Sequence, residues 1–136
     1  VPFGVLLAGA AAASTTFHVL EGGDTRVVDS EGGFRSRPLS ATGDPREPEV
    51  FEVTLAPGWL EEAAPHALDT FEHIVVVRGS LEIRAGDRIA SLASGDVVFF
   101  RADRPHAYRN PGASDTVLHL TMTYAGDWNA AVDAAF

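Results

Sequence analysis

The residues of this chain that could bind a metal or take part in acid–base chemistry are histidines and carboxylates. The histidines are His18, His66, His73, His106 and His119. A lone histidine is more often a hydrogen-bonded structural residue than a ligand, so order and spacing must select among them. Order and spacing select three residues. His66 lies in a loop after Pro57-Gly58, Glu72 follows six residues later, and His106 comes directly after Pro105.

These three residues combine two imidazoles with one carboxylate. This donor set suits a divalent transition metal with open coordination positions, such as iron, manganese, nickel or zinc. The alternative is a polar cluster whose members hydrogen-bond one another inside an apolar pocket, or hold an organic ligand. Spacing alone leaves both interpretations open.

Other catalytic patterns are absent from the sequence. The chain contains no cysteine, which excludes thiol catalysis, zinc–thiolate sites and disulfides. It has no phosphate-binding glycine-rich loop with a lysine and no Gly-x-Ser-x-Gly elbow. Glu61 and Glu62 form an acidic pair that we expect in a solvated loop, because a glycosidase dyad must face one cavity.

Length and charge narrow the class of protein further. A chain of 136 residues fits one domain that needs no disulfide or metal to be stable. The formal net charge of −9 opposes direct binding to nucleic acid. Residues 1–13 form the longest apolar run, but a membrane-spanning helix needs about 20 residues, and no basic residue precedes the run as in a signal peptide.

Short apolar or alternating segments, separated by Gly, Pro and Asp turns, must position the three residues. They predict strands at residues 25–29, 34–37, 50–55, 74–77, 81–84, 88–92, 97–100, 106–110 and 116–124. The Ala-rich segment 128–136 predicts a short helix. Without a βαβ pattern, this arrangement favours an antiparallel sandwich or barrel.

Strand alternation assigns side chains to the faces of such a barrel. Glu72 shares a face with Ile74 and Val76, whereas His73 faces away. His106 and Tyr108 likewise share a face. We therefore expect Glu72, His106 and Tyr108 to point into the barrel.

The stretch from Pro57 to Asn110 resembles the two conserved motifs of the cupin superfamily. The first motif corresponds to Gly58, His66, Glu72 and Gly79, and the second to Gly95-Asp96, Pro105-His106 and Asn110. The resemblance implies an all-β fold, a small antiparallel jelly-roll barrel, with His66, Glu72 and His106 as metal ligands.

The sequence departs from the cupin pattern at three positions. Leu68 stands where metal-binding cupins usually carry a second histidine, which reduces the usual four ligands to three. Arg101 and Asp103 stand where the second motif usually has Pro and Gly.

More of the chain is similar to the C-terminal cupin sensor of bacterial regulators whose N-terminal half is an XRE-type helix-turn-helix. The similar segments are residues 1–7, 35–39, 52–58 and 100–110. The resemblance implies that residues 1–14 are a linker from a DNA-binding domain not present in this chain, and that residues 15–136 form the cupin domain. It also implies a cytoplasmic protein.

The expected function is therefore non-catalytic sensing of a small-molecule effector by a homodimer, with DNA bound only through the helix-turn-helix. We expect the effector pocket to contain His66, Glu72, His106 and Tyr108, with Val76 and Phe100 as apolar walls. The alternative is a metal-dependent cupin enzyme, a dioxygenase or isomerase, in which the metal at His66, Glu72 and His106 activates oxygen or polarises a carbonyl.

Overall fold

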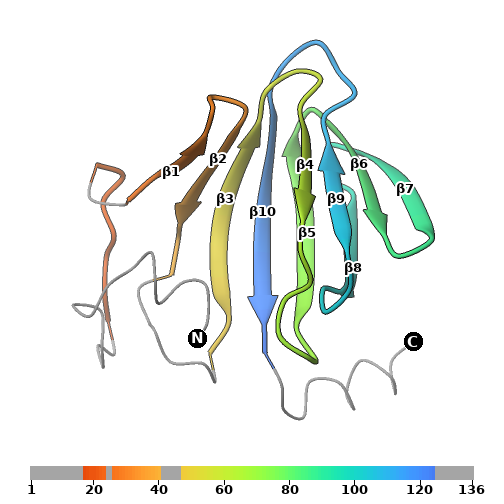
Figure 1. Cartoon of the computed structure of the whole chain (residues 1–136). Helices are drawn as coiled ribbons and strands as arrows, with labels where there is room; N and C mark the ends of the chain where they lie inside the picture. Colours follow the sequence, from red (N-terminus) through yellow and green to blue (C-terminus); the bar gives the residue numbers. More distant parts are fainter. Residues whose placement is uncertain (1–16, 24–25, 41–46, 125–136) are drawn as a thin grey trace.

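The structure, a computed structural model, describes residues 17–23, 26–40 and 47–124, and these form ten β-strands (Figure 1). Their bounds are β1 Val28–Ser30, β2 Phe34–Pro38, β3 Glu49–Leu55, β4 Leu60–Ala63, β5 Phe71–Arg78, β6 Ser80–Ala85, β7 Arg88–Ala93, β8 Val97–Arg101, β9 His106–Arg109 and β10 Thr116–Thr123.

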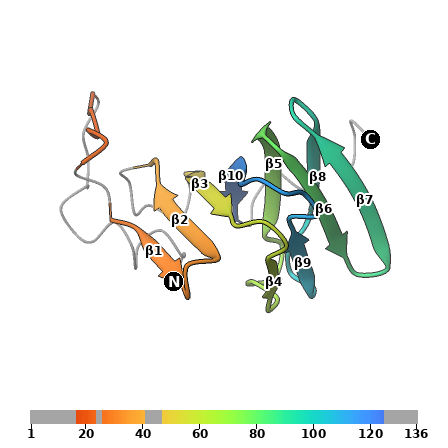
Figure 2. The same ribbon diagram turned by 90° about the horizontal axis from the view of Figure 1, so that it is seen from above.

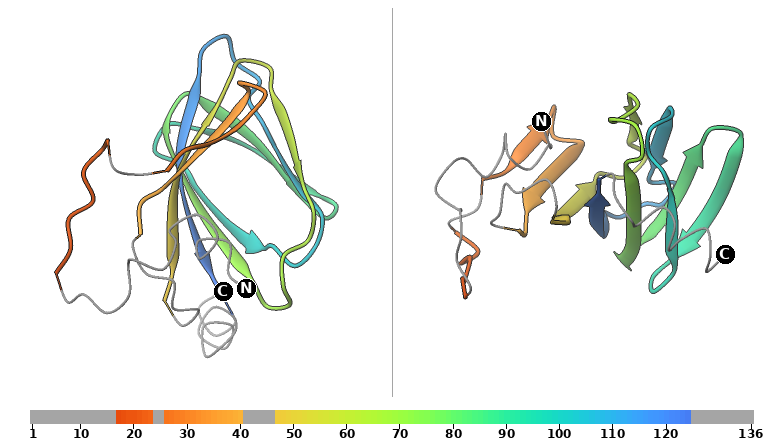
Figure 3. Two further views of the ribbon diagram at one scale, coloured as in Figure 1. Left: turned by 60° about the vertical axis from the view of Figure 1, so that its left-hand side comes forward. Right: turned by 90° about the horizontal axis from the view of Figure 1, so that it is seen from below.

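The strands form two sheets in which every neighbouring pair is antiparallel. The larger sheet has the order β1-β2-β3-β10-β5-β8, and the smaller has the order β4-β9-β6-β7. Figure 2 shows β1 and β2 extending the larger sheet at one side of the molecule. In the left view of Figure 3, the two sheets face each other as two layers. The predicted antiparallel all-β architecture is confirmed.

The core lies between the sheets and follows from strict alternation in the central strands. In β3 and β10 every second residue is buried, because one face of each strand meets the other sheet. The buried apolar cluster joins both layers and comprises Phe51, Val53, Leu55, Ile74, Val76, Leu81, Ile83, Leu92, Tyr108, Leu118, Leu120 and Met122.

The tight turn between β5 and β6, which lie in different sheets, passes from one sheet to the other at Gly79. This residue has φ +89°, a left-handed conformation that L side chains rarely adopt. A Cβ here would also lie 2.8 Å from the backbone oxygen of Asp115. Only glycine fits at this position between the two sheets.

The strand predictions agree with the structure except at β4, at the start of the first strand and at the start of β5, which is Phe71 rather than Ile74. The strand β4 was not expected, and it contains Glu61 and Glu62, which the sequence placed in a loop. The prediction of a loop at Glu61 and Glu62 is wrong, because β4 forms by pairing with β9. The short polar sequence of β4 does not reveal this tertiary contact. The first strand begins at Val28, later than predicted. The linker predicted at residues 1–14 and the helix predicted at residues 128–136 lie outside the described residues.

The described residues contain no helix of the length and apolarity that crossing a membrane requires.

Candidate functional site

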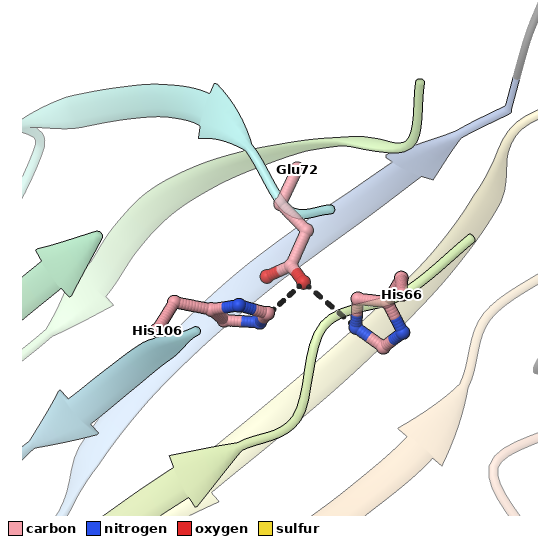
Figure 4. A group of neighbouring side chains, drawn as sticks. All are labelled: His66, Glu72 and His106. Atoms are coloured by element: carbon pink, nitrogen blue, oxygen red, sulfur yellow. Dashed lines mark ion pairs between the residues drawn. The ribbon is translucent and has the colours of Figure 1, made fainter. Parts of the chain in front are cut away.

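His66, Glu72 and His106 come together from three separate segments (Figure 4). Glu72 is the second residue of β5, His106 begins β9, and His66 lies in the loop that joins β4 to β5. The Nε2 atoms of both histidines lie 3.1 Å from Oε2 of Glu72. The grouping predicted from the order of these residues in the sequence is therefore present in the folded chain.

Burial distinguishes the three members of this cluster. The side chains of Glu72 and His106 are fully buried, whereas His66 retains 29% of its side-chain exposure. The cluster is therefore closed on the side of the core and most exposed at His66.

A backbone contact sets the orientation of the His106 ring. Its Nδ1 lies 2.8 Å from the carbonyl oxygen of Arg104, an acceptor, so Nδ1 carries the proton and donates. In the neutral ring, Nε2 then presents a lone pair toward the Glu72 carboxylate. Two lone pairs at this distance require a proton or a cation between them.

The Glu72 carboxylate stays ionised in spite of its burial. Burial alone would raise its pKa, but contacts with His106, His66 and the hydroxyl of Tyr108 lower the pKa to about 2. The Tyr108 hydroxyl donates a hydrogen bond to Oε1 of Glu72. Burial, together with the charges of Glu72 and Glu61, raises the Tyr108 pKa well above its ordinary value, so Tyr108 remains a donor.

The charge on Glu72 also acts on His106. Burial opposes protonation of the imidazole, but the contact with Glu72 and its charge outweigh burial and raise the pKa of His106. In the absence of a metal, a proton shared between Glu72 and His106 therefore balances the negative charge of the carboxylate.

The cluster also fits a divalent metal. Glu72 Oε2 and His106 Nε2 are both buried and neither has a hydrogen-bond partner of acceptable geometry, although they lie close together. Ligand atoms around a four-coordinate zinc lie roughly 3.3 Å apart, close to the separations observed here. The three donor atoms lie within 4.8 Å of one another, as ligands of one ion must.

Leu68 supplies nothing to this cluster. Its side chain is 77% exposed, so the position where metal-binding cupins usually carry a histidine points to solvent. A metal held by His66, Glu72 and His106 would retain open coordination positions for a ligand.

The two unusual residues Arg101 and Asp103 hold the His66 loop in place. Arg101 Nη2 lies 2.6 Å from Oδ1 of Asp69 and 3.0 Å from Oδ2 of Asp103. The same Asp103 oxygen accepts the backbone N–H of Asp69 at 2.9 Å. We call Arg101, Asp103 and Asp69 the loop clamp, because they tie the loop carrying His66 to the turn that precedes His106.

A cavity of about 290 Å³ lies between the two sheets and reaches the cluster at His66, Glu72 and Tyr108. Its walls are mostly apolar and come largely from the larger sheet: Val28, Phe34, Phe51, Val53, Leu118, Leu120 and Met122. Such a combination of apolar walls and a few convergent polar groups is typical of a small-molecule site.

The remaining predicted pocket residues lie elsewhere. Val76 is part of the core cluster. Phe100 packs against His106, with ring centroids 5.4 Å apart, and lines a second cavity of about 380 Å³ between β6, β7 and β8. His106 therefore lies behind the first cavity, with Phe100 on its far side.

Sequence reasoning missed the contribution of β1, β2 and β4 to the cavity. Ser30, Ser36 and Glu61 line it, and Glu61 lies directly opposite Tyr108 in the pairing of β4 with β9. The alternation in β2, which buries Ser36, was the available signal for this residue, but the segment is too short for a firm assignment.

The family follows from a comparison with known proteins. Residues 51–123, which include His66, Glu72 and His106, match the model of the family described as "Cupin domain". This chain belongs to the cupin family. The fold, the cluster at the strand ends and the family model agree.

The similar proteins include transcriptional regulators. The HTH-type transcriptional regulator SutR of Escherichia coli is 34% identical over 76 residues, covering 56% of this chain and 43% of the regulator. This cupin chain thus spans less than half the length of that relative. A solved cupin domain of an XRE family transcriptional regulator from Enterobacter cloacae is 32% identical, with a TM-score of 0.65, and covers 69% of this chain and 99% of the other.

Enzymes share the fold as well. A solved sugar phosphate isomerase of the cupin superfamily from Silicibacter pomeroyi is 22% identical, with a TM-score of 0.56, and covers 68% of this chain and 60% of the other. At this identity the likeness concerns the fold alone. The cupin domain resembles those of regulators more closely in sequence.

Proposed function

We propose that this cupin domain is the sensor of a bacterial transcriptional regulator and binds a small-molecule effector in the cavity above His66, Glu72 and His106. The observation that carries the proposal is an apolar cavity that reaches the polar side chains of His66, Glu72 and Tyr108, with His106 in contact with Glu72 behind them. The sequence similarity to cupin domains of regulators supports the same function.

Different residues of the cavity would contact different parts of the effector. Apolar walls such as Phe51 and Leu120 take up the body of the effector, and burial of that surface drives binding. His66, the accessible member of the cluster, orients the polar end of the effector. Tyr108 and Arg104 hold Glu72 and His106 in fixed orientations, so little order is lost when the effector binds.

We propose further that His66, Glu72 and His106 hold one divalent transition metal. Bound there, the ion would supply open coordination positions for an oxygen or nitrogen atom of the effector. The Arg104 carbonyl fixes the His106 tautomer that leaves Nε2 available as a ligand, which is a common second contact of metal-binding histidines.

The signal would leave the domain through its N-terminal strands. The cavity is lined by Val28 and Ser30 of β1, and β1 lies at the edge of the larger sheet. Edge strands of this kind pair readily across a two-fold axis in a homodimer. An effector that contacts β1 would favour one dimer geometry and thereby reposition DNA-binding domains attached to each protomer in the cytoplasm.

The metal is tested by elemental analysis of protein purified without chelators or metal-affinity resin. We expect near-stoichiometric metal in the unmodified chain and its loss in His106→Ala. The matched control is His119→Ala, since His119 is a half-exposed residue of β10 outside the cluster. Absence of metal in all three proteins would overturn the metal site and leave His66, Glu72 and Tyr108 as the polar groups that an organic effector meets in the cavity.

The effector cavity is tested by filling it. Ala63→Phe places a large side chain in the cavity, and Leu60→Phe makes a similar change on the exposed side of the same strand. In a thermal-shift screen of small metabolites, we expect effectors to stabilise the unmodified chain and Leu60→Phe but not Ala63→Phe. If every stabilising compound acts equally on both variants, the cavity is not the effector site.

A metal-dependent enzyme is the second candidate, and the three-residue ligand set favours it. Two histidines and one carboxylate with open positions can support oxygen chemistry or polarise a carbonyl. A regulator sensor releases the effector unchanged, whereas an enzyme converts it. Mass spectrometry of a compound recovered after incubation with metal-loaded protein distinguishes the two functions.

A further inference from the structure

Glu61 is a carboxylate of the cavity that the proposed metal site does not use. It lies in β4, where alternation turns Glu61 and Ala63 toward the cavity and Leu60 and Glu62 outward. Glu62 also borders the cavity, but its side chain is 71% exposed and lies 3.8 Å from Arg84 outside the barrel. The two adjacent glutamates therefore have different environments.

The side chain of Glu61 is held in position by Trp59. The indole Nε1 donates to Oε1 of Glu61 at 2.9 Å. Trp59 itself lies on the backbone of Gly33, where an added Cβ would be 1.9 Å from the ring. Glu61 is thus oriented by an aromatic ring that packs against the turn between β1 and β2.

The Trp59 contact brings no positive charge to Glu61. An indole N–H is a neutral donor, and a carboxylate has about four acceptor positions on its two oxygens. Among the described residues that line the cavity, none is a lysine or an arginine, and the imidazole of His66 lies against Glu72. A half-buried carboxylate between apolar walls is costly unless a positive charge meets it.

We infer that Glu61 is a second recognition group of the cavity and that the cavity selects ligands with an ammonium group on an apolar body. The ammonium pairs with Glu61, while the body contacts walls such as Phe34 and Leu120. The cavity volume equals that of roughly ten water molecules, so the ligand is small. This inference rests on the proposed effector-binding function and specifies its ligand class.

The test uses three probes of similar size and different charge: 2-phenylethylamine, 2-phenylethanol and phenylacetate. Their binding to the full chain is measured by calorimetry or NMR titration, in EDTA so that the amine cannot coordinate a metal. We expect 2-phenylethylamine to bind at least about tenfold more tightly than 2-phenylethanol, and phenylacetate to bind most weakly.

Two variants connect this preference to Glu61. Glu61→Gln keeps an acceptor for Trp59 but removes the charge, so it should reduce amine binding to the level of the alcohol. Glu62→Gln, which removes the same charge from the exposed neighbour, should retain the preference. Equal loss in both variants would overturn the assignment to Glu61, because the overall negative charge of the protein would then explain the selectivity.

The outcomes also separate this inference from the proposed function. If the three probes bind equally and Ala63→Phe blocks them, the cavity is a ligand site and the ammonium selectivity is wrong. If the amine binds but Ala63→Phe does not block it, the amine binds outside the cavity and the ammonium selectivity of the cavity is overturned, whereas the effector site is judged by the screen of metabolites. Failure of all three probes to bind at millimolar concentration overturns the ligand class proposed here.

Discussion

Tyr108 contributes, after His106 and His66, to keeping the Glu72 carboxylate ionised within the core. Its hydroxyl is buried and donates a hydrogen bond to Glu72. The residue was predicted to face the barrel, but its role as a donor to Glu72 required the register of β9 and the rotamer of Glu72. Tyr108 thus acts through Glu72 rather than only as a wall of the cavity.

We expect Tyr108→Phe to lower the free energy of unfolding by about 1.5–3 kcal/mol, because it leaves an oxygen of a buried carboxylate without its donor. The measurement is urea unfolding at neutral pH in the presence of EDTA. Tyr124→Phe is the control, since the Tyr124 hydroxyl contacts the weak acceptor Sδ of Met122, and its effect should be less than about 1 kcal/mol. A Tyr108→Phe protein as stable as the control would show that Glu72 does not depend on this hydroxyl.

At the scale of elements, the loop clamp connects two segments that each carry a histidine of the cluster. Arg101 ends β8, while Asp69 belongs to the loop before β5 and has φ +63°. Backbone hydrogen bonds reinforce the connection, since Ala102 N–H donates to the Thr70 carbonyl and His66 N–H donates to the Ala102 carbonyl. Charged residues thus hold this loop at the positions where the cupin motif usually has Pro and Gly.

The clamp predicts a pH dependence of stability. The hydrogen bond from Arg101 holds the pKa of Asp103 below its ordinary value of 3.8, with the Asp69 N–H adding to the effect. Because the folded pKa is the lower one, this stabilisation is complete above pH 3.8 and is lost as the pH falls through the folded value. We expect Asp103→Asn to lower the Tm at neutral pH and to approach the unmodified protein in acid.

The control for this prediction is Asp87→Asn, which removes the same charge from the exposed turn between β6 and β7. Thermal unfolding of the three proteins is followed from neutral pH into acid. A constant difference between Asp103→Asn and the unmodified chain across that range would contradict the prediction, because the lost stability would then be independent of the Asp103 charge.

The sequence predicted most strands because their apolar alternation and glycine turns are local signals. Val53, Leu55, Leu118 and Leu120 all occupy the buried face that their spacing indicates. The strand β4 was missed because Leu-Glu-Glu-Ala has no such pattern, and its pairing with β9 is decided by the rest of the fold. Local signals thus predict strands with one buried face and fail for short polar strands.

The candidate site was predictable only in part for a related reason. His66, Glu72 and His106 were found because few residue types act as metal ligands and their order resembles a known motif. Glu61 was assigned to solvent, since two adjacent glutamates give no indication of which one faces inward. That distinction depends on the register of β4 against β9, which places Glu61 opposite Tyr108.

At the scale of the whole molecule, the net charge of −9 opposes binding of this domain to nucleic acid. Phosphate backbones bind proteins mainly through Lys and Arg, and this chain has ten such residues against nineteen acidic ones. Several of its arginines are already paired with carboxylates, as Arg101 is with Asp69 and Asp103.

We therefore expect the isolated chain not to bind duplex DNA, even at low salt, when measured by fluorescence anisotropy of a labelled duplex. DNA binding in a complete regulator would then depend on a separate domain. Binding that weakens as salt is added would contradict this expectation, since it would indicate a basic surface contributed by this chain.

The position of β1 has one more consequence, which concerns how fast a ligand can enter and leave. This strand is three residues long and, among the described strands, pairs with β2 alone, yet it forms part of the cavity wall through Val28 and Ser30. Short edge strands open more often than strands in the middle of a sheet. Among the described strands, the pairing of β1 with β2 is the shortest ladder. In a chain whose β1 edge is not covered by a dimer partner, we therefore expect the lifetime of a complex to depend on how often β1 opens, and not only on the strength of the contacts at the histidines.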